Sequence, residues 1–308
     1  MTTDQPVRMA GRLSGQEAAG VQALVDAAAA DDGVFPLSEE ALLRVRHGGP
    51  VGAPGVESPV HLLSETPYGL AGYAYLDQSA GELVVHPRFR RRGYGTALLK
   101  TALAGPEPTV RFWAHGDLPG ARAFAERNGL KRIRVLWQMR RTLAEPLPEA
   151  PLPAGVTLRH FRPGVDEEAW LKVNARAFAD HPEQGRWTAD DLQLREAEPW
   201  FDPAGFLLAV DIEDTLLGFH WTKVHPEGIG EVYVLGVDPG GHRRGLGSAL
   251  TVAGLEYLAS RGLDTAMLYT DESNAAAVRL YRRLGFEVAS TDVSYSGPEG
   301  RSDIRGIS

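Results

Sequence analysis

A glycine-rich pattern occurs twice along the chain, and it limits the possible folds more than any other feature. Residues 84–99 read VVHPRFRRRGYGTALL, and residues 236–251 read GVDPGGHRRGLGSALT. A constant offset of 152 residues separates Gly93 from Gly245, and the same offset holds for the neighbouring prolines and arginines. This spacing is the size of a domain, because solenoid repeats recur every ~20–50 residues. We therefore expect two related domains in the 308 residues.

A proline-rich segment between the two copies predicts the boundary between these domains. Thr142 is followed by LAEPLPEAPLPAG, which contains four prolines. Proline fixes φ and lacks an amide donor, so the run is typical of a semi-rigid extended linker. The expected division is an N-terminal domain over residues 1–145, a linker over 146–154 and a C-terminal domain over 155–308.

Strand and helix patterns alternate in the second half, and the first half shows a thinner version of the same order. Strands are predicted at Val156–His160, Gly205–Asp211, Leu216–Val224, Gly230–Val237, Thr265–Tyr269 and Phe286–Val293. Helices are predicted at Asp166–Phe178, Ala189–Ala197, Gly245–Ser260 and Asn274–Leu284. This order predicts an α/β fold in which a sheet is covered by helices on both faces.

Composition excludes several classes of function. A net charge of −8 and a pI near 5.6 argue against nucleic acid as a partner and against a polybasic membrane anchor. The absence of cysteine excludes disulfides and a thiol nucleophile, and it fits a reducing compartment. The sequence shows neither a secretory h-region nor a run of about 18 apolar residues. We expect a cytoplasmic monomer with no nucleic-acid or membrane partner.

The repeated glycine turn has the properties of an anion-binding site. A strand ending at Val237 leads through HRRGLG into a helix, and the first turn of a helix presents free N–H groups to an anion. Glycines at 245 and 247 allow close approach of the backbone, and Arg243 and Arg244 add charge. The predicted ligand is a pyrophosphate. The alternative is a plain strand–turn–helix whose glycines serve packing; no P-loop lysine follows, and no third glycine completes a dinucleotide fingerprint.

These residues resemble the acetyl-CoA pyrophosphate loop of the GCN5-related N-acetyltransferases, which has the pattern [Q/R]-x-x-G-x-[G/A]. The first copy fits from Arg90 to Gly95, whereas the second has His242 where Gln or Arg is usual. Residues 274–286 are similar to the second signature of the family. The resemblance implies two tandem domains of this family, each a mixed twisted sheet between helices, with acetyl-CoA as co-substrate.

Longer segments in both halves resemble the tandem acetyltransferases of mycothiol biosynthesis. They are residues 82–87, 112–116, 181–187, 219–226 and 230–239. This resemblance implies transfer of acetyl from acetyl-CoA to the cysteinyl amine of a cysteinyl-glucosaminyl-inositol, the last step of that synthesis. Two alternatives stay open: a tandem acetyltransferase for another small amine, and an acyl-CoA sensor without catalysis.

Acetyl transfer to an amine needs a proton acceptor, and a proton donor assists the leaving thiolate. Glu231 is the candidate base, because it lies near the start of the strand that leads to the glycine turn. Tyr281 is the candidate acid, since it stands seven residues, or two helical turns, after Asn274 on the same face. The alternatives are a solvent-facing carboxylate and a tyrosine that only packs.

Backbone groups of Leu235, Gly236 and Val237 are expected to bind the pantetheine arm as an added strand, with a bulge at Gly236. The residues expected to bind acetyl-CoA in the second half are Leu235, Gly236, Val237, His242, Arg243, Arg244, Gly245, Leu246, Gly247, Ser248, Asn274, Ala275, Ala276, Ala277, Val278 and Arg279. The corresponding residues of the first half are Leu83, Val84, Val85, Arg91, Arg92, Gly93, Tyr94, Gly95 and Thr96.

The resemblance also implies substrate contacts from Glu39, Glu183, Lys223, Glu231 and Tyr269. Glu39 follows FPLS, a pattern similar to a capping box, and would have to reach the substrate from the first domain. No metal site is expected, because the nine histidines are scattered and no HExxH occurs.

The first half is expected to bind acetyl-CoA without catalysing transfer. Its counterpart of Glu231 is Ser79 at the offset of 152 residues, and an offset of 156 places Ala125 and Leu118 opposite Tyr281 and Asn274.

Overall fold

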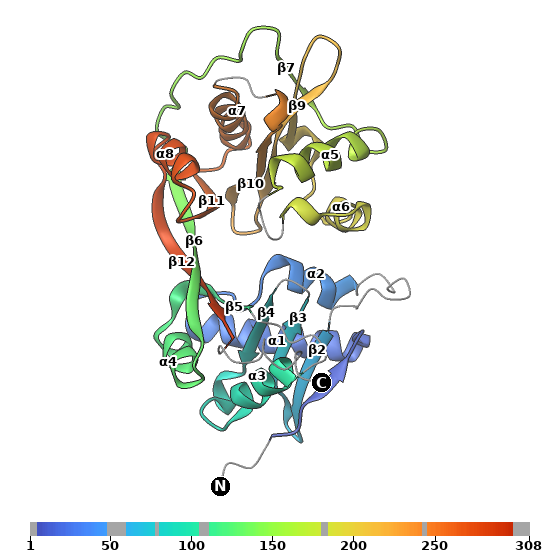
Figure 1. Ribbon diagram of the computed structural model, residues 1–308, viewed down its shortest axis with the longest axis vertical. Helices are drawn as coiled ribbons and strands as arrows, with labels where there is room; N and C mark the ends of the chain where they lie inside the picture. The colour runs from blue at the N-terminus through green and yellow to red at the C-terminus, as the bar shows by residue number, and fades with distance from the viewer. Residues whose placement is uncertain are drawn as a thin grey trace, which may run out of the picture. The chain divides into compact units, whose positions relative to one another are not determined.

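The computed structural model describes residues 5–47, 60–77, 80–104, 111–179, 184–241 and 245–297 (Figure 1). The chain forms two compact units. Unit 1 comprises Met1–Leu136 together with Thr291–Ser308, and unit 2 comprises Trp137–Ser290. Among the helices in the described ranges, none is long and apolar enough to span a bilayer.

Unit 1 is a sheet between two layers of helices. Its strands are β1 (Arg8–Ala10), β2 (Val60–Thr66), β3 (Gly69–Leu76), β4 (Gly81–Val85), β5 (Arg111–Ala114) and the end of β12 (Glu287–Ser296), adjacent in that order. All neighbours are antiparallel except β4 and β5, which run parallel. Its helices are α1 (Gly15–Asp32), α2 (Glu39–His47), α3 (Tyr94–Ala104) and α4 (Pro119–Arg127).

Alternation along the strands of unit 1 divides its apolar side chains between two cores. Tyr73 and Tyr75 of β3 pack with α1 and α2, whereas Ala74 and Leu76 pack with α3 and α4. Helix α1 begins with a capping box, in which Ser14 and Glu17 each bind the backbone of the other. Helix α2 lacks the expected box: Ser38 accepts the N–H of Ala41, which has no carboxylate to return a bond.

Unit 2 repeats this arrangement. Its strand order is β6 (Lys131–Thr142), β11 (Thr265–Asp271), β10 (Ile229–Val237), β9 (Leu216–Val224), β8 (Phe206–Val210) and β7 (Thr157–His160). Strands β10 and β11 are parallel, and β7 to β10 form an antiparallel series. Its helices are α5 (Glu167–Ala177), α6 (Ala189–Glu196), α7 (Leu246–Ser260) and α8 (Ala275–Arg283).

The two faces of the unit 2 sheet carry different cores. Helices α5 and α6 cover one face, where Trp170 packs edge-on against Trp221 and Phe219. Helices α7 and α8 cover the other, where Leu255 and Tyr281 pack against Val232. We call these the α5–α6 face and the α7–α8 face. The predicted α/β class and the predicted strands and helices of the second half are confirmed, with ends that differ by up to three residues.

The domain limits differ from the expected ones in two places. The end of β12, from Val293 to Ser296, pairs with β5 and so belongs to unit 1, although it closes the second half of the sequence. The end of β6, from Trp137, belongs to unit 2, and the proline-rich segment follows it there, with Leu143 and Leu147 on the core of α7 and α8. An open sheet edge accepts any strand that satisfies its hydrogen bonds, so sequence order does not decide which half supplies the strand.

Candidate active site

The second glycine turn has the geometry of an anion-binding helix start. Strand β10 ends at Val237, and Gly245 adopts φ +91° as the N-cap of α7. This φ lies in the left-handed region, which explains the glycine. Among the described residues, a Cβ at Gly247 would meet Val237 alone, at 3.8 Å, so packing against those residues does not require the glycine. The N–H groups of Leu246, Gly247 and Ser248 open the helix without intrahelical acceptors. His242, Arg243 and Arg244 lie outside the described residues.

Unit 1 repeats the turn. Gly93 adopts φ +93° directly before α3, and Tyr94, Gly95 and Thr96 form the first helical turn. The start of α3 and the start of α7 are 152 residues apart, as the repeat predicts.

The two arginines before Gly93 are exposed, as charge contacts with a phosphate require. They are Arg91, whose φ is +62°, and Arg92. Arg90 forms ion pairs instead, because its guanidinium contacts Asp31 and, at 2.6 Å, Asp32. Gly95 also has a packing role, since a Cβ there would lie 3.3 Å from the Phe124 ring.

Strands β10 and β11 stay paired over only part of their length. Their parallel register runs from Ile229–Thr265 to Val232–Leu268, yet β10 continues to Val237. Leu235, Gly236 and Val237 therefore extend past the paired segment toward the glycine turn. In unit 1, the register ends at Glu82–Trp113, and Leu83, Val84 and Val85 continue in the same way. Both units offer a strand edge to which an extended ligand can add.

The predicted bulge at Gly236 is wrong in position. The β9–β10 register shifts between Val232 and Val234, which makes Tyr233 the extra residue. Gly236 stays in register with Phe219, and a Cβ at Gly236 would lie 2.7 Å from the Phe219 ring. Packing against this ring accounts for the glycine, while the bulge turns both Tyr233 and Val234 toward the α5–α6 face.

Glu231 lies on the α5–α6 face and is only 6% exposed. Its neighbour Val232 packs with α7, and alternation directs Glu231 to the opposite face. Its Oε2 lies 2.7 Å from Nε2 of His225, a residue that the sequence analysis did not single out. A signal was present: Lys223 and His225 are two positions apart, so a strand places both on one face.

Two of the predicted substrate residues share this face with Glu231. Lys223 is the cross-strand partner of Glu231 on β9, and its Nζ lies 4.5 Å from the ring centre of Trp200. On β11, Met267 pairs with Glu231, so Tyr269 two residues later points the same way and is 42% exposed. Its hydroxyl accepts a hydrogen bond from Gln138 at 2.8 Å.

The remaining two predicted substrate residues are Glu39 and Glu183. Glu39 is the first residue of α2 in unit 1. Glu183 lies outside the described residues.

Tyr281 is buried on the α7–α8 face, in contact with Phe286. Burial raises the pKa of its phenol to about 12, so the phenol keeps its proton at neutral pH. Glu231 and Tyr281 thus belong to opposite faces of the sheet. The pairing of β10 with β11 ends after Val232, so the sheet opens there between its two faces.

The start of α8 is formed as the sequence predicts. Asn274 is exposed and caps the helix, because its Oδ1 accepts the N–H of Ala277 at 3.1 Å. Ala275, Ala276 and Arg279 are exposed, whereas Val278 is buried.

The counterpart of α8 in unit 1 lacks the phenol. Helices α4 and α8 begin and end 156 residues apart, which confirms that offset and places Ala125 opposite Tyr281 and Leu118 opposite Asn274. Ser79 lies outside the described residues.

Unit 1 nevertheless has titratable groups that the alignment missed. Nδ1 of His115 lies 3.0 Å from Asp292, and Nε2 lies 3.7 Å from Glu82 on β4. Burial opposes the charged imidazolium, but Asp292 and Glu82 outweigh it and raise the pKa of His115 to about 10. The sequence could not indicate this cluster, because its members lie 33 to 210 residues apart.

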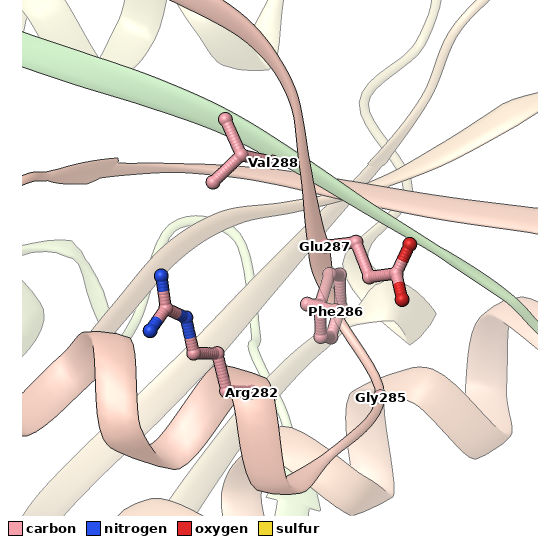
Figure 2. Close-up of a pocket in the computed structure, with 5 residues that line it drawn as sticks. All are labelled: Arg282, Gly285, Phe286, Glu287 and Val288. Carbon is pink, nitrogen blue, oxygen red and sulfur yellow. The ribbon is translucent and has the colours of Figure 1, made fainter.

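A surface hollow lies apart from these groups (Figure 2). Its volume is about 470 Å³, and it is lined by Arg282, Gly285, Phe286, Glu287 and Val288, where α8 ends and β12 begins. None of the predicted catalytic, acetyl-CoA or substrate residues lines it, so we do not assign it to acetyl transfer. In the described parts of the chain, no group of three or more His, Asp or Glu side chains is arranged to hold a metal ion.

Comparison with known proteins agrees with this geometry. The acetyltransferase (GNAT) family model matches residues 37–130 and 169–286, which include both glycine turns. A crystal structure of a GCN5-related N-acetyltransferase from Sphaerobacter thermophilus is 28% identical, with a TM-score of 0.62 over 94% of this chain and 95% of that one. A tandem GNAT protein from the clavulanic acid biosynthesis pathway shares the fold, with a TM-score of 0.68 and 21% identity over 97% of this chain and all of that one. The fold and the two turns define a tandem GNAT acetyltransferase.

Relatives narrow the class further. The mycothiol acetyltransferase of Thermobispora bispora is 56% identical over 298 residues, which cover 94% of this chain and 99% of the relative. That of Salinispora tropica is also 56% identical, over 92% of this chain and 94% of the relative. The chain belongs to the mycothiol acetyltransferase family.

Proposed function

We propose that this chain transfers the acetyl group of acetyl-CoA to the cysteinyl amine of the mycothiol precursor, a cysteinyl-glucosaminyl-inositol. The observation that carries the proposal is the buried carboxylate of Glu231 on β10, directly before the point where β10 and β11 stop pairing. The acceptor is the one that the family resemblance implies, and the name of the relatives, mycothiol acetyltransferase, supports it. The reaction belongs in the cytoplasm, and the monomeric state and the lack of metal, nucleic-acid and membrane partners remain predictions.

Acetyl-CoA is proposed to bind with its pyrophosphate at the first turn of α7 and its pantetheine along Leu235–Val237. Backbone N–H groups at a helix start suit a diphosphate, and an unpaired strand edge suits an amide-containing chain. Exposed groups at the start of α8, such as Ala275 and Arg279, would contact the cofactor arm. The thioester would then lie between the α5–α6 and α7–α8 faces.

Chemistry requires the amine to be neutral when it attacks. A cysteinyl α-amine has an ordinary pKa of about 7.7–8.0, so a base increases the reactive fraction at neutral pH. The amine nitrogen bonds to the thioester carbon, the C–S bond breaks, and the amine proton passes to Glu231, directly or through a water. Tyr281 donates its proton to the leaving sulfur, which gives the free thiol of CoA. Lys223, Tyr269, Glu39 and Glu183 are proposed to bind the polar acceptor.

Unit 1 is proposed to bind acetyl-CoA without transferring it. Its glycine turn and the extension of β4 to Val85 repeat the features of unit 2. Ala125 stands where the proton donor would be required.

An assay of thioester loss against a panel of amines tests the proposal. We expect rapid loss of thioester absorbance with the cysteinyl-glucosaminyl-inositol, and slow loss with an aminoglycoside or an N-terminal peptide. Mass spectrometry should find one acetyl group on nitrogen, with the acceptor thiol still titratable.

Glu231→Ala should lower kcat by about 10²–10⁴-fold, the usual effect of losing a general base. Faster turnover with another amine would mean that this amine, rather than the mycothiol precursor, is the acceptor. A lack of turnover with every amine would favour an acyl-CoA sensor without catalysis.

A further inference from the structure

A tight turn between β9 and β10 holds His225 beside the start of β10. The N–H of His225 donates to the carbonyl of Ile229, and the N–H of Gly228 donates to the carbonyl of His225, both at 2.9 Å. Gly228 adopts φ +76°, a conformation that favours glycine. Both backbone bonds fix the Cα–Cβ direction of His225 relative to the strands that it joins.

The strand register brings His225 to the same face as Glu231. Lys223 is directly opposite Glu231, and His225 lies two residues after Lys223, so its side chain is a diagonal neighbour of Glu231. The 2.7 Å contact between Nε2 and Oε2 joins two side chains that are 22% and 8% exposed. Little water therefore competes for this bond.

The contact has a defined direction. A carboxylate that acts as a base is ionised and only accepts hydrogen bonds, so in the proposed mechanism the Nε2–H group of His225 donates a hydrogen bond to Oε2 of Glu231. Oε2 is then engaged, and Oε1 is the oxygen left to receive a proton. A glutamate side chain has three rotatable bonds, and the contact with His225 restricts rotation about them. This restriction matters because a misplacement of about 1 Å in a catalytic group can lower the rate by up to about 10²-fold.

We propose that His225 is a positioning residue for the acetyl transfer, which acts by holding the Glu231 carboxylate with one oxygen directed to the acceptor amine or its water. The inference rests on the proposed function, because it presumes that Glu231 accepts the proton. His225 itself does not contact the substrate in this mechanism.

A double-mutant cycle on the full chain separates positioning from a structural role. The variants are His225→Leu, Glu231→Gln and the double variant. His225→Leu should lower kcat about 10-fold and leave the KM for acetyl-CoA unchanged, because the acetyl-CoA contacts lie elsewhere. In the Glu231→Gln background the same change should alter kcat by less than about 2-fold, since the group through which His225 acts is already lost.

Two further variants complete the experiment: a conservative substitution of His225 and a control substitution of a histidine outside the site. His225→Gln places an N–H donor near the position of Nε2 and should keep kcat within about 3-fold of wild type. His160→Leu removes an exposed histidine of β7 and should change nothing. Thermal unfolding of each variant reports whether the turn still folds, and a folded His225→Gln keeps the test valid if His225→Leu is unstable.

Three results would overturn the proposal or its basis, and they differ. An unchanged kcat in His225→Leu removes His225 from the mechanism. An equal loss with and without the Glu231 carboxylate means that His225 acts only through the fold of the turn. Wild-type activity of Glu231→Gln alone refutes the proposed base, which is a failure of the proposed function rather than of the contact.

Discussion

Tyr281 combines burial in the core with the proton-donor role that we propose for it. Its ring contributes to the core of the α7–α8 face, and that same burial raises its pKa to about 12. A phenol that remains protonated at neutral pH still holds the proton that a leaving thiolate needs, and its hydroxyl is a small part of its packing surface. In the proposed mechanism Tyr281 therefore both packs and donates a proton, and a substitution can separate the two.

Tyr281→Phe keeps the ring and removes the proton. We expect kcat to fall by about 10–100-fold, with acetyl-CoA affinity and the unfolding temperature almost unchanged. Calorimetric titration of acetyl-CoA and steady-state kinetics provide the measurement. A parallel loss of affinity and turnover would mean that the tyrosine only packs.

His115 makes the stability of unit 1 dependent on pH. Its pKa is about 10 in the folded protein and about 6.5 when unfolded, so the folded state binds the proton more tightly. The resulting stabilisation is complete below about pH 6.5 and is lost as pH rises through about 10. Urea unfolding of wild type should show a falling free energy of unfolding over this range. His115→Gln should show a flatter profile, and an identical pH slope in both proteins would contradict the assignment.

At the scale of elements, each unit contains the same strand–turn–helix motif. A strand continues past its parallel neighbour, a glycine of positive φ follows, and a helix starts directly after that glycine. The motif recurs at an offset of 152 residues, from Gly93 to Gly245. In the proposed binding mode it needs no side-chain chemistry, because backbone N–H groups would contact the anion. Proton transfer needs side chains, and here the two units differ.

A carboxylate at either helix start tests this division of labour. Gly247→Glu should abolish turnover, since the new charge repels the diphosphate at the catalytic unit. Gly95→Glu should block acetyl-CoA in unit 1 and leave turnover measurable. Gly95→Ala is the control for crowding of Phe124, 3.3 Å from the added Cβ. Calorimetry counts the acetyl-CoA bound, and complete inactivity of Gly95→Glu with a normal Gly95→Ala would refute the division.

For the whole molecule, the end of the chain completes the fold of its beginning. Val293 is fully buried with Leu62 and Phe112 in unit 1, although it follows the last helix of unit 2. The end of the C-terminal strand is thus part of unit 1.

Val293→Asp should therefore destabilise unit 1 and spare unit 2. An unpaired charge in this core should cost about 3–5 kcal/mol. Hydrogen exchange should accelerate in β2 to β5 and remain slow in β8 to β10. Val288→Asp, on the same strand but at a site 42% exposed, is the control. Equal loss of protection in both sheets would contradict the division into units.

Local pattern by itself determined much of this protein. Period-two and helical spacing located the elements of the second half to within a few residues, from β7 to α8. The two glycine turns were predictable because a strand, a glycine and a helix are adjacent in the chain, and the resemblance of those residues led to the acetyltransferase class. Glu231 was selected by its place on the strand that leads to the second turn, and Tyr281 by its place two helical turns after Asn274.

Tertiary structure decided what depends on residues distant in sequence. The bulge falls at Tyr233, and residue 236 is a glycine because the Phe219 ring occupies the space that a Cβ there would need. The cluster of Glu82, His115 and Asp292 exists only once β12 pairs with β5. Which strand completes a sheet is settled by hydrogen-bond pairing across an open edge, and that competition between distant segments leaves no periodic pattern in the sequence.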